Sequence, residues 1–476
     1  MASERPVLIQ GGMGVAVSGW RLAKAVAELG HLGVVSGTAL DTVMVRRLQL
    51  GDSGGQVRRA LEALPVPGAA ERILDRYFVP GGKEPDQRFT LSSMKRDVPS
   101  RNLAELLVAA NFVEVYLAKE GHNGPVGINY LEKVQAPTLP SLYGAMLAGV
   151  DYVLMGAGIP RTIPAVLDEL AKGAPVEMRL DVKGATKGDQ FRAQFDPTSV
   201  MGDAPPAVKR PAFLAIVSSH VLAVMLATKV DIPPDGFIVE APTAGGHNAP
   251  PRGKRQLNEA GEPIYGDRDV PDLAVIADLG LPFWLAGGYS DPERVRDALN
   301  QGATGVQVGT AFAYCAESGF DPDIKRRVLE LSRQSEASVF TDPLASPSGF
   351  PFKVVQLEGT LSDDEVYDGR TREPCELGFL RSAFRTEEGA IGWRCPAEPV
   401  EVYLGKGGEA DDTVDRKCLC NALLANVGLG QVQRHGDHEP VLITSGDEVA
   451  HIAKYLPPGA DSYTAADVVN HLLPQG

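Results

Sequence analysis

Short apolar runs recur through residues 7–308, and amphipathic stretches separate most of them. Continuous apolar runs of this length are typical of parallel strands that are buried on both faces. The runs lie at residues 7–10, 33–36, 126–129, 152–155, 213–217, 237–240, 283–286 and 305–308. The helical stretches lie at residues 20–29, 164–171, 221–228, 273–279 and 292–301. Eight strands that alternate with helices predict an α/β fold, the (β/α)8 TIM barrel.

Two segments do not fit this alternation and are predicted to be insertions into the barrel. Residues 176–182 alternate between apolar and charged side chains, which indicates a half-exposed antiparallel strand. With residues 190–195 this strand is expected to form a hairpin, within an insertion at about residues 176–211. The other insertion, at about residues 41–121, is expected to be helical.

The character of the sequence changes after Pro343. Residues 346–351 read Ser-Pro-Ser-Gly-Phe-Pro and are interpreted as a turn-rich linker. We therefore predict a barrel domain at residues 1–343 and a C-terminal extension at residues 344–476, which holds four of the five cysteines.

Composition and charge narrow the classes of function. The chain has 476 residues, of which 44% are hydrophobic and 22% are charged, a globular mixture. A net charge of −15 disfavours binding to nucleic acids and to anionic membranes. Residues 1–10 lack the apolar stretch of a leader, and residues 212–230 are interpreted as a buried strand and a helix. Five cysteines make no disulfide framework, so we expect a cytoplasmic enzyme with reduced thiols. As its partner we expect a small-molecule substrate.

The turns after the last two predicted strands are candidates for a phosphate site. Gly287-Gly288 follows the seventh strand, and Gly309-Thr310 follows the eighth. Glycines let the backbone approach an anion closely, and N–H groups at a helix start attract it. Barrels of this type commonly bind phosphate with these two loops. The alternative is that the glycines form tight turns and nothing more.

The first and third predicted strands end in a second candidate site. Gly11-Gly12-Met13 follows the first strand without the G-x-G-x-x-G spacing of dinucleotide-binding proteins. A glycine-rich rim lets a flat ring lie against the backbone. Asn129 ends the third strand, and its amide both donates and accepts hydrogen bonds, which suits a heterocycle or a ribityl chain. An ordinary turn-capping role is the alternative for Asn129.

His247 is the best-placed catalytic candidate among the eight histidines. It lies on the loop after the sixth strand and follows the glycine pair Gly245-Gly246. An imidazole can take or give a proton near neutral pH. Position alone does not separate this role from that of a surface or structural histidine.

Five motifs in order resemble the nitronate monooxygenases, formerly called 2-nitropropane dioxygenases. They are Gln10-Gly11-Gly12-Met13, Val126-Gly127-Ile128-Asn129, Ala244-Gly245-Gly246-His247, Ala286-Gly287-Gly288 and Gln307-Val308-Gly309-Thr310. The same superfamily includes FMN-dependent enoyl-acyl-carrier-protein reductases and NAD(P)H:quinone reductases. The resemblance covers about residues 5–335, without the two insertions. Thr243 departs from the frequent family pattern, so the substrate pocket is expected to differ more than the cofactor site.

The resemblance implies that FMN lies at the C-terminal face of the barrel. Its implied contacts are Gly11, Gly12, Met13, Asn129, Glu240, Gly245, Gly246, Gly287, Gly288, Gln307, Val308, Gly309 and Thr310, with His247 as the catalytic residue. The activity implied first is the oxidation of nitronates or nitroalkanes with O₂. An NAD(P)H-dependent enoyl-thioester reductase, with an acyl carrier thioester as substrate, is the alternative. A non-catalytic flavin-binding protein is the third reading, and a homo-oligomer stays open.

The extension contains a cysteine cluster that the resemblance does not explain. Cys375, Cys395, Cys418 and Cys420 fall within 46 residues of a chain that looks cytoplasmic. Such spacing favours a metal centre over disulfides. Zinc, an iron–sulfur cluster and unligated thiols remain open, because C-x-C is unusual for either metal. Cys315 is expected to be a small buried hydrophobic residue.

Overall fold

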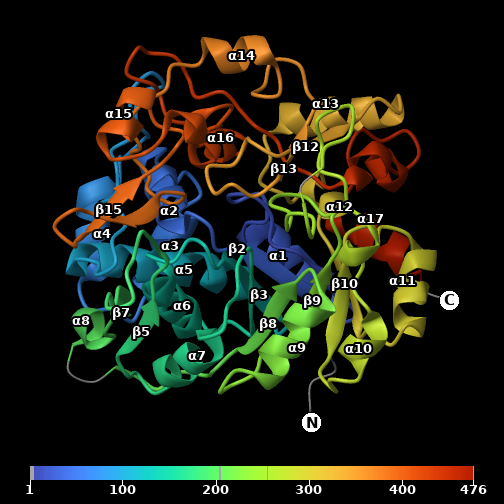
Figure 1. Ribbon diagram of the computed structural model, residues 1–476, viewed down its shortest axis with the longest axis horizontal. Coiled ribbons are helices and arrows are strands. Elements are labelled where there is room, and N and C mark those ends of the chain that lie inside the picture. The colour runs from blue at the N-terminus through green and yellow to red at the C-terminus, as the bar shows by residue number, and fades with distance from the viewer. Residues whose placement is uncertain (1–4, 203–204, 255, 475–476) are drawn as a thin grey trace.

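The computed structural model describes residues 5–202, 205–254 and 256–474 of the chain. Within these residues, eight parallel strands close into one barrel, with helices around it (Figure 1). Around the barrel they run β1 (Leu8–Gln10), β2 (Leu32–Ser36), β3 (Val126–Leu131), β4 (Tyr152–Gly156), β8 (Ala212–Val217), β9 (Gly236–Glu240), β10 (Phe283–Ala286) and β11 (Gly305–Val308). Each coincides with a predicted run, so the predicted (β/α)8 barrel is confirmed. The expectation that residues 1–10 form no leader involves residues 1–4, which lie outside the described residues.

Successive side chains of the barrel strands alternate between its interior and its helical coat. Ile9, Leu154, Ile238 and Trp284 pack together in one apolar cluster. Their neighbours along the strands belong to a second cluster that the helices share. The Trp284 indole Nε1–H donates to the Pro6 carbonyl at 2.7 Å, which satisfies the polar atom of this buried side chain. Each apolar run therefore contributes side chains both to the interior of the barrel and to the apolar layer between the strands and the helices.

The helices that follow the strands confirm the predicted helical stretches. They are α1 (Trp20–Glu28), α6 (Thr138–Leu147), α7 (Ile163–Ala171), α9 (His220–Thr228), α10 (Leu273–Ala277), α11 (Pro292–Asn300), α12 (Thr310–Ala313) and α13 (Pro322–Arg333), with the short 3-10 helix η1 (Asp267–Asp269) before α10. Side-chain caps begin three of them: the Ser219 hydroxyl accepts from the Leu222 N–H, the Asp272 carboxylate from the Ala274 N–H, and the Asp321 carboxylate from the Asp323 N–H.

The insertion after β2 is helical, as predicted. It contains α2 (Leu40–Gln49), α3 (Gln56–Glu62), α4 (Ala69–Tyr77) and α5 (Arg101–Lys119). Nearly every residue of α5 is buried, because α1, α2 and α6 pack around it. Glu114 on α5 is neutralised by Arg47 at 2.7 Å and accepts from the Trp20 N–H at 2.8 Å. Burial of this carboxylate is therefore compensated by a cation and a backbone donor.

The insertion after α7 confirms the predicted hairpin. Strand β5 (Val176–Arg179) pairs antiparallel with β7 (Arg192–Phe195), and its burial alternates along the strand. The short strand β6 (Val182–Lys183) lies between them in sequence, and α8 (Thr198–Met201) follows. The apolar side chains of β5 face the core, while its charged side chains face solvent.

The C-terminal extension lies across one side of the barrel rather than apart from it (Figure 1). Its elements, with the strand leading into it, are β12 (Val339–Asp342), β13 (Phe352–Val355), α14 (Asp364–Gly369), β14 (Ser382–Arg385), β15 (Ile391–Arg394), α15 (Val400–Gly405), η2 (Ala410–Thr413), α16 (Leu419–Ala425), η3 (Asp447–Tyr455) and α17 (Ala465–Leu472). Ile443, Val449 and Val468 belong to the same apolar cluster as the outer faces of the barrel strands. Strand β14 also pairs with β6 of the hairpin insertion.

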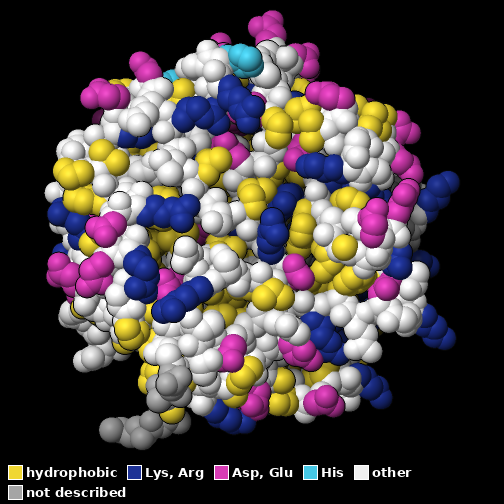
Figure 2. Space-filling view, turned by 90° about the vertical axis from the view of Figure 1, so that its left-hand side faces the viewer, with side chains coloured by type: hydrophobic (Ala, Val, Ile, Leu, Met, Phe, Trp, Pro, Cys, Tyr) yellow, Lys and Arg dark blue, Asp and Glu magenta, His cyan; other side chains and the backbone are white. Residues whose placement is uncertain are grey.

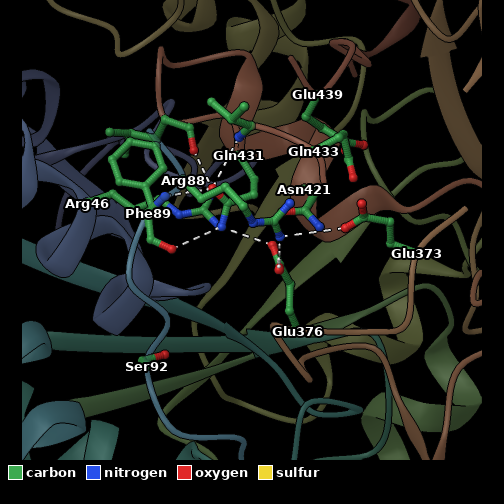
Figure 3. A network of polar contacts seen from close by, with 12 residues as sticks. Arg46, Arg88, Phe89, Ser92, Glu373, Glu376, Asn421, Gln431, Gln433 and Glu439 are labelled. Carbon is green, nitrogen blue, oxygen red and sulfur yellow. Dashed lines mark hydrogen bonds and ion pairs between the residues drawn. The ribbon is translucent and has the colours of Figure 1, made fainter. Parts of the chain in front are cut away.

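A buried polar network joins the helical insertion to the extension (Figure 3). Arg88 contacts Glu376 at 2.9 Å and Glu373 at 3.6 Å, and the fully buried Arg46 lies 3.9 Å from Glu376. The Phe89 N–H donates to a side-chain oxygen of Gln431 at 2.8 Å. Insertion and extension, far apart in sequence, therefore form one packed unit.

The visible face of the surface carries charges of both signs (Figure 2). On the face seen in Figure 2, basic and acidic side chains are interspersed, and apolar atoms show in the hollows between them. The apolar stretch at residues 212–230 forms β8 and α9, as predicted. Among the described residues, no helix is both long enough and apolar enough to cross a membrane.

Candidate active site

A cavity opens where the barrel strands end at their carboxyl termini. Its volume is about 1700 Å³, with its solvent-open mouth included. All fourteen residues predicted for the cofactor and for catalysis line it: Gly11, Gly12, Met13, Asn129, Glu240, Gly245, Gly246, His247, Gly287, Gly288, Gln307, Val308, Gly309 and Thr310. They come from the ends of five different strands, and the closed barrel brings those ends together.

The glycine rim after β1 lets two side chains approach the backbone closely. A Cβ at Gly12 would lie 2.4 Å from the Asn129 Cβ, and one at Gly11 would lie 3.2 Å from the Gln307 side chain. Both glycines therefore permit contacts with side chains of the cavity wall. The Gln307 Oε1 atom is buried and has no hydrogen-bond partner among the described residues. A buried acceptor of this kind calls for a donor, and a ligand N–H would supply one.

The loop after β10 presents open backbone to the cavity. Gly287 and Gly288 have φ of +87° and +85°, which favours glycine at both positions. A Cβ at Gly287 would lie 2.8 Å from the Thr243 hydroxyl oxygen. At Gly288 the nearest atoms would be 3.8 Å or more away, so a ligand can approach its backbone. Thr310 begins α12 on the neighbouring loop.

His247 is held by residues that follow the barrel. Its Nε2 atom lies 2.7 Å from the Ser346 hydroxyl oxygen, and its ring meets Phe352 edge to face with centroids 4.7 Å apart. The Asn248 N–H donates to the Pro351 carbonyl at 3.0 Å, which fixes the backbone beside it. Enclosure by protein and the charge of Lys133 hold the His247 pKa well below its usual value. The imidazole is therefore neutral near pH 7.

Hydroxyl groups connect His247 to a lysine. The Ser346 and Ser348 hydroxyl oxygens lie 2.8 Å apart, and the Lys133 Nζ donates to Ser348 at 3.3 Å. The Lys133 ammonium lies 3.5 Å from the centroid of the Phe350 ring. Burial lowers the pKa of Lys133 from 10.5 to about 7. A row of groups able to exchange protons thus leads from Lys133 to the catalytic candidate.

Two carboxyl groups border the cavity in environments that favour their neutral form. Burial raises the pKa of Glu240, at the end of β9, from 4.5 to about 7. Burial also raises the pKa of Glu448, which lies near Gly288 and 4.0 Å from the Lys454 ammonium. Glu240 therefore carries less negative charge near neutral pH than an exposed carboxylate does.

Sequence reasoning missed the part of the cavity wall that the extension supplies. Residues 444–446 cross between two barrel loops: the Thr444 hydroxyl accepts from the Gly246 N–H, and the Gly446 N–H donates to the Thr310 hydroxyl, both at 2.9 Å. A Cβ at Gly245 would lie 2.7 Å from the Gly446 nitrogen. Gly245 therefore also serves close packing against this segment.

The segment at residues 346–351 is more than a linker, because Ser346 contacts His247. Ser346 and Ser348 indicated a turn in the sequence. Nothing in their spacing indicated that Ser346 contacts His247, which lies 99 residues earlier. Phe379, Leu380, Leu419, Cys420 and Leu423 of the extension also line the cavity. Such contacts depend on how the extension packs, which residue patterns do not specify.

The structure brings Cys375, Cys395, Cys418 and Cys420 around one smaller cavity in the extension. All four are free thiols. Over the residues that the structure describes, no group of three or more His, Cys, Asp or Glu side chains has the geometry to hold a metal ion. Cys315 is fully buried in the main core, as expected of a small apolar residue.

The residues of the large cavity fit a flavin mononucleotide. The unpartnered Gln307 acceptor matches a ring N–H, and the open backbone at Gly288 matches a phosphate. Asn129 adds an amide at the rim. Thr310 and the glycine backbone lie at the ends of adjacent strands, so a single ligand can reach both. Fold and cavity together define a (β/α)8 barrel with a nucleotide-sized site at its C-terminal face.

Comparisons with known proteins agree with this class. Residues 206–344 match the family described as nitronate monooxygenase. A probable nitronate monooxygenase of Bacillus subtilis is 39% identical over 102 residues, which are 21% of this chain and 26% of that protein. An indene-carboxyl-CoA dehydrogenase of Mycobacterium tuberculosis is 26% identical over 231 residues, 45% of this chain and 60% of that protein. The matches thus span about a quarter to three fifths of these relatives.

Among solved structures, FabK from Thermotoga maritima is similar with a TM-score of 0.47 and 17% identity, and the match covers 99% of this chain and 92% of that one. The likeness to the nitronate monooxygenase family is carried by residues 206–344 and by these partial matches to its members. The predicted resemblance is therefore confirmed.

Proposed function

We propose that the chain is an FMN-dependent oxidoreductase that oxidises nitronates or nitroalkanes with O₂. The observation that carries the proposal is the position of His247, whose ring lines the same cavity as the thirteen proposed cofactor contacts. The match of residues 206–344 to the nitronate monooxygenase family supports it, because this segment contains the loop of His247 and both proposed phosphate loops.

FMN, when bound, supplies the redox chemistry, and the protein supplies binding, orientation and proton handling. The backbone of Gly287-Gly288 and Gly309-Thr310 would hold the phosphate, and Asn129 and Gln307 would hold the polar atoms of the flavin. Gly11 and Gly12 keep the rim free of Cβ atoms where Gln307 and Asn129 pack. Phe352 packs edge to face against His247, and the segment at residues 444–446 lines the same cavity.

His247 would take the proton of a carbon acid or orient a nitro group. Its low pKa keeps the imidazole neutral, so a lone pair is available for a proton near pH 7. The contact with Ser346 fixes the ring and selects the nitrogen that faces the substrate. The hydroxyl groups of Ser346 and Ser348 would pass that proton to Lys133.

Reduction of an enoyl thioester by NAD(P)H is the second candidate, and one feature favours it. A groove lined by Lys133, Arg161, Arg179 and Arg381 adjoins the cavity, and both are lined by Ala157, Phe379 and Leu380. Basic side chains beside an apolar wall suit a substrate with a charged carrier arm. One relative acts on a carboxyl-CoA compound according to its name.

Substrate assays separate the two candidates. The protein purified with its flavin is supplied either with a nitronate and O₂, or with NAD(P)H and an enoyl thioester under anaerobic conditions. The proposal expects O₂ consumption that depends on the nitronate and is lost in His247→Ala. Turnover of NAD(P)H and thioester without nitronate oxidation would contradict it in favour of the reductase.

A further inference from the structure

Glu240 stands between the large cavity and a second, smaller one. The second cavity has a volume of about 360 Å³ with its mouth included, and both ends of the His247 loop line it, at residues 240–242 and 248–250. Of the residues that the structure describes, Glu240 alone lines both cavities. It ends β9 and pairs in register with Ala286, directly before the proposed phosphate loop. Its side chain therefore borders the proposed flavin site and a separate pocket.

Two other buried carboxylates of the chain are compensated by cations, whereas Glu240 is not. Glu398 contacts Lys406 at 2.8 Å, and Glu439 contacts Arg370 at 2.7 Å. Within the described part of the chain, the Glu240 carboxyl group has neither an ion pair nor a hydrogen bond. An enclosed carboxyl group without a partner costs the fold free energy. Its position therefore points to a role in the site rather than in packing.

The surroundings of Glu240 keep a proton on its carboxyl group. Burial raises the pKa of Glu240 from 4.5 to about 7. Other titratable groups line the same cavities: Tyr130, His247, Tyr289, Cys420 and Glu448 the large one, and Arg252, Tyr265 and Asp269 the second. None of them is close enough to add to the shift. Enclosure by protein is therefore what favours the neutral acid.

His247 and Glu240 have pKa shifts of opposite direction beside one cavity. The imidazole is held neutral and can take a proton, whereas the carboxyl group is held neutral and can give one. Two titratable groups whose surroundings push their pKa values apart are a common arrangement of the base and the acid of an active site. Glu240 therefore complements the role proposed for His247.

The second cavity offers polar groups that can hold water. The Asn248 side chain is 1% exposed, and its Oδ1 atom has no hydrogen-bond partner among the described residues. The Asn248 Nδ2 donates to the Ala244 carbonyl at 3.0 Å, which fixes the amide in place. Ser218 and Tyr265 add hydroxyl groups to the lining, and Arg252 is exposed to solvent. Polar cavities with unmet hydrogen-bonding groups are where buried water is found.

We propose that Glu240 is a proton donor of the active site, which regains its proton from solvent through the second cavity. This inference rests on the proposed oxidoreductase function. In the donating step, the O–H bond of the carboxyl group breaks, and the proton moves to an oxygen or nitrogen atom in the large cavity that gains negative charge during turnover. The carboxylate then takes a proton from water in the second cavity, and that water takes one from solvent.

The pH dependence of turnover tests the donor role. Because the carboxyl group must be protonated to donate, activity is present below its pKa and is lost as pH rises through it. Glu240→Gln should lower turnover by ~10²–10⁴ and remove this basic limb of kcat/KM. Glu240→Asp, which keeps a shorter acid, should recover part of both. Glu336→Gln, at an exposed site, is the control and should leave both unchanged.

Infrared spectroscopy of the flavin-loaded protein tests the inference without a substrate. Difference spectra between about pH 6 and about pH 9 should contain a protonated-carboxyl band that is missing in Glu240→Gln. Ser218→Leu, which fills the second cavity, should keep this equilibrium band but lower kcat about tenfold, because the carboxylate regains its proton more slowly. Flavin content checks that each variant remains folded.

Three results would overturn the inference. One is a Glu240 carboxyl group that is ionised across this pH range, seen as identical difference spectra of Glu240→Gln and the unaltered protein. Another is unaltered turnover with an unaltered basic limb in Glu240→Gln. The third is an unchanged kcat in Ser218→Leu, which would exclude the route through the second cavity. The infrared result does not depend on turnover, so it stands if the protein does not oxidise nitronates.

Discussion

Among single residues, His247 matters most for the proposed activity. Its identity and its loop were predictable, because a histidine after two glycines at a strand end stands out in the sequence. Its partner Ser346 and the aromatic ring of Phe352 were not, since both come from a segment interpreted as a linker. Contacts between residues about a hundred positions apart leave no local pattern in the sequence from which they could be predicted.

Replacing His247 should remove turnover but keep the flavin. His247→Ala is expected to lower turnover by ~10²–10⁴, the range for losing a positioned proton-transfer group. Ser346→Ala should lower it by a smaller factor, about tenfold, because the imidazole remains but is less well oriented. His435→Ala, in an exposed loop, is the control. Steady-state kinetics with flavin quantified for each variant checks this, and unchanged turnover in His247→Ala would remove the residue from the mechanism.

Burial lowers the His247 pKa most, and the charge of Lys133 lowers it further, so Lys133 shifts the acid limb of the pH profile. A nearby cation disfavours protonation of an imidazole, and Lys133 lowers the His247 pKa in this way. His247 must be neutral to accept a proton, so activity is present above its pKa and lost as pH falls through it. In Lys133→Met the pKa rises toward 6.5, and the acid limb of kcat/KM should move to higher pH. The control Lys187→Met, at an exposed site, should leave the pH profile unchanged. An unchanged profile in Lys133→Met would show that this lysine does not act on His247.

At the scale of elements, the alternation of apolar runs and helices determined the fold. Each of the eight runs became a barrel strand, and the alternating segment at residues 176–179 became a hairpin strand. Strand positions were predictable because burial on both faces requires continuous apolar residues. The extension was less predictable because its short strands and 3-10 helices carry no strong period.

Close packing of β11 requires glycine at residue 305. A Cβ there would lie 1.9 Å from the Val7 carbonyl oxygen, so the neighbouring strand would have to move. Gly305→Ala should destabilise the fold by about 1–3 kcal/mol or more, as overpacking does. Gly266→Ala has open space around it and should be nearly neutral. Thermal unfolding of both variants checks this, and equal stability would show that the strands adjust without cost.

At the scale of the whole molecule, the extension completes the cavity and the insertion supports the extension. A polar network joins the helical insertion to the extension (Figure 3); its members are Arg46, Arg88, Glu373 and Glu376. This arrangement was not predictable, because the sequence showed the insertion and the extension as two separate departures from the barrel pattern. A shared apolar core makes them one body with it.

Loss of a charge from this network should weaken the whole fold. Glu376→Gln leaves the buried guanidinium of Arg46 without its nearest carboxylate, and breaking a buried pair costs about 3–5 kcal/mol. Glu169→Gln removes one partner of an exposed pair with Lys172 and should change stability by about 1 kcal/mol or less. Urea unfolding at one pH measures both. A Glu376→Gln variant as stable as Glu169→Gln would show that the network contributes little.

The proposed cofactor site depends on the glycine backbone at the end of β10, which would hold the phosphate of FMN. The most direct measurement is the flavin content of Gly288→Val against Gly302→Val. Both glycines have φ of +85°, so both variants suffer the same backbone strain, but only Gly288 lines the cavity. The account predicts that Gly302→Val is purified with flavin as the unaltered protein is, whereas Gly288→Val is purified without it. A Gly288→Val protein that binds FMN with unaltered affinity would contradict the account.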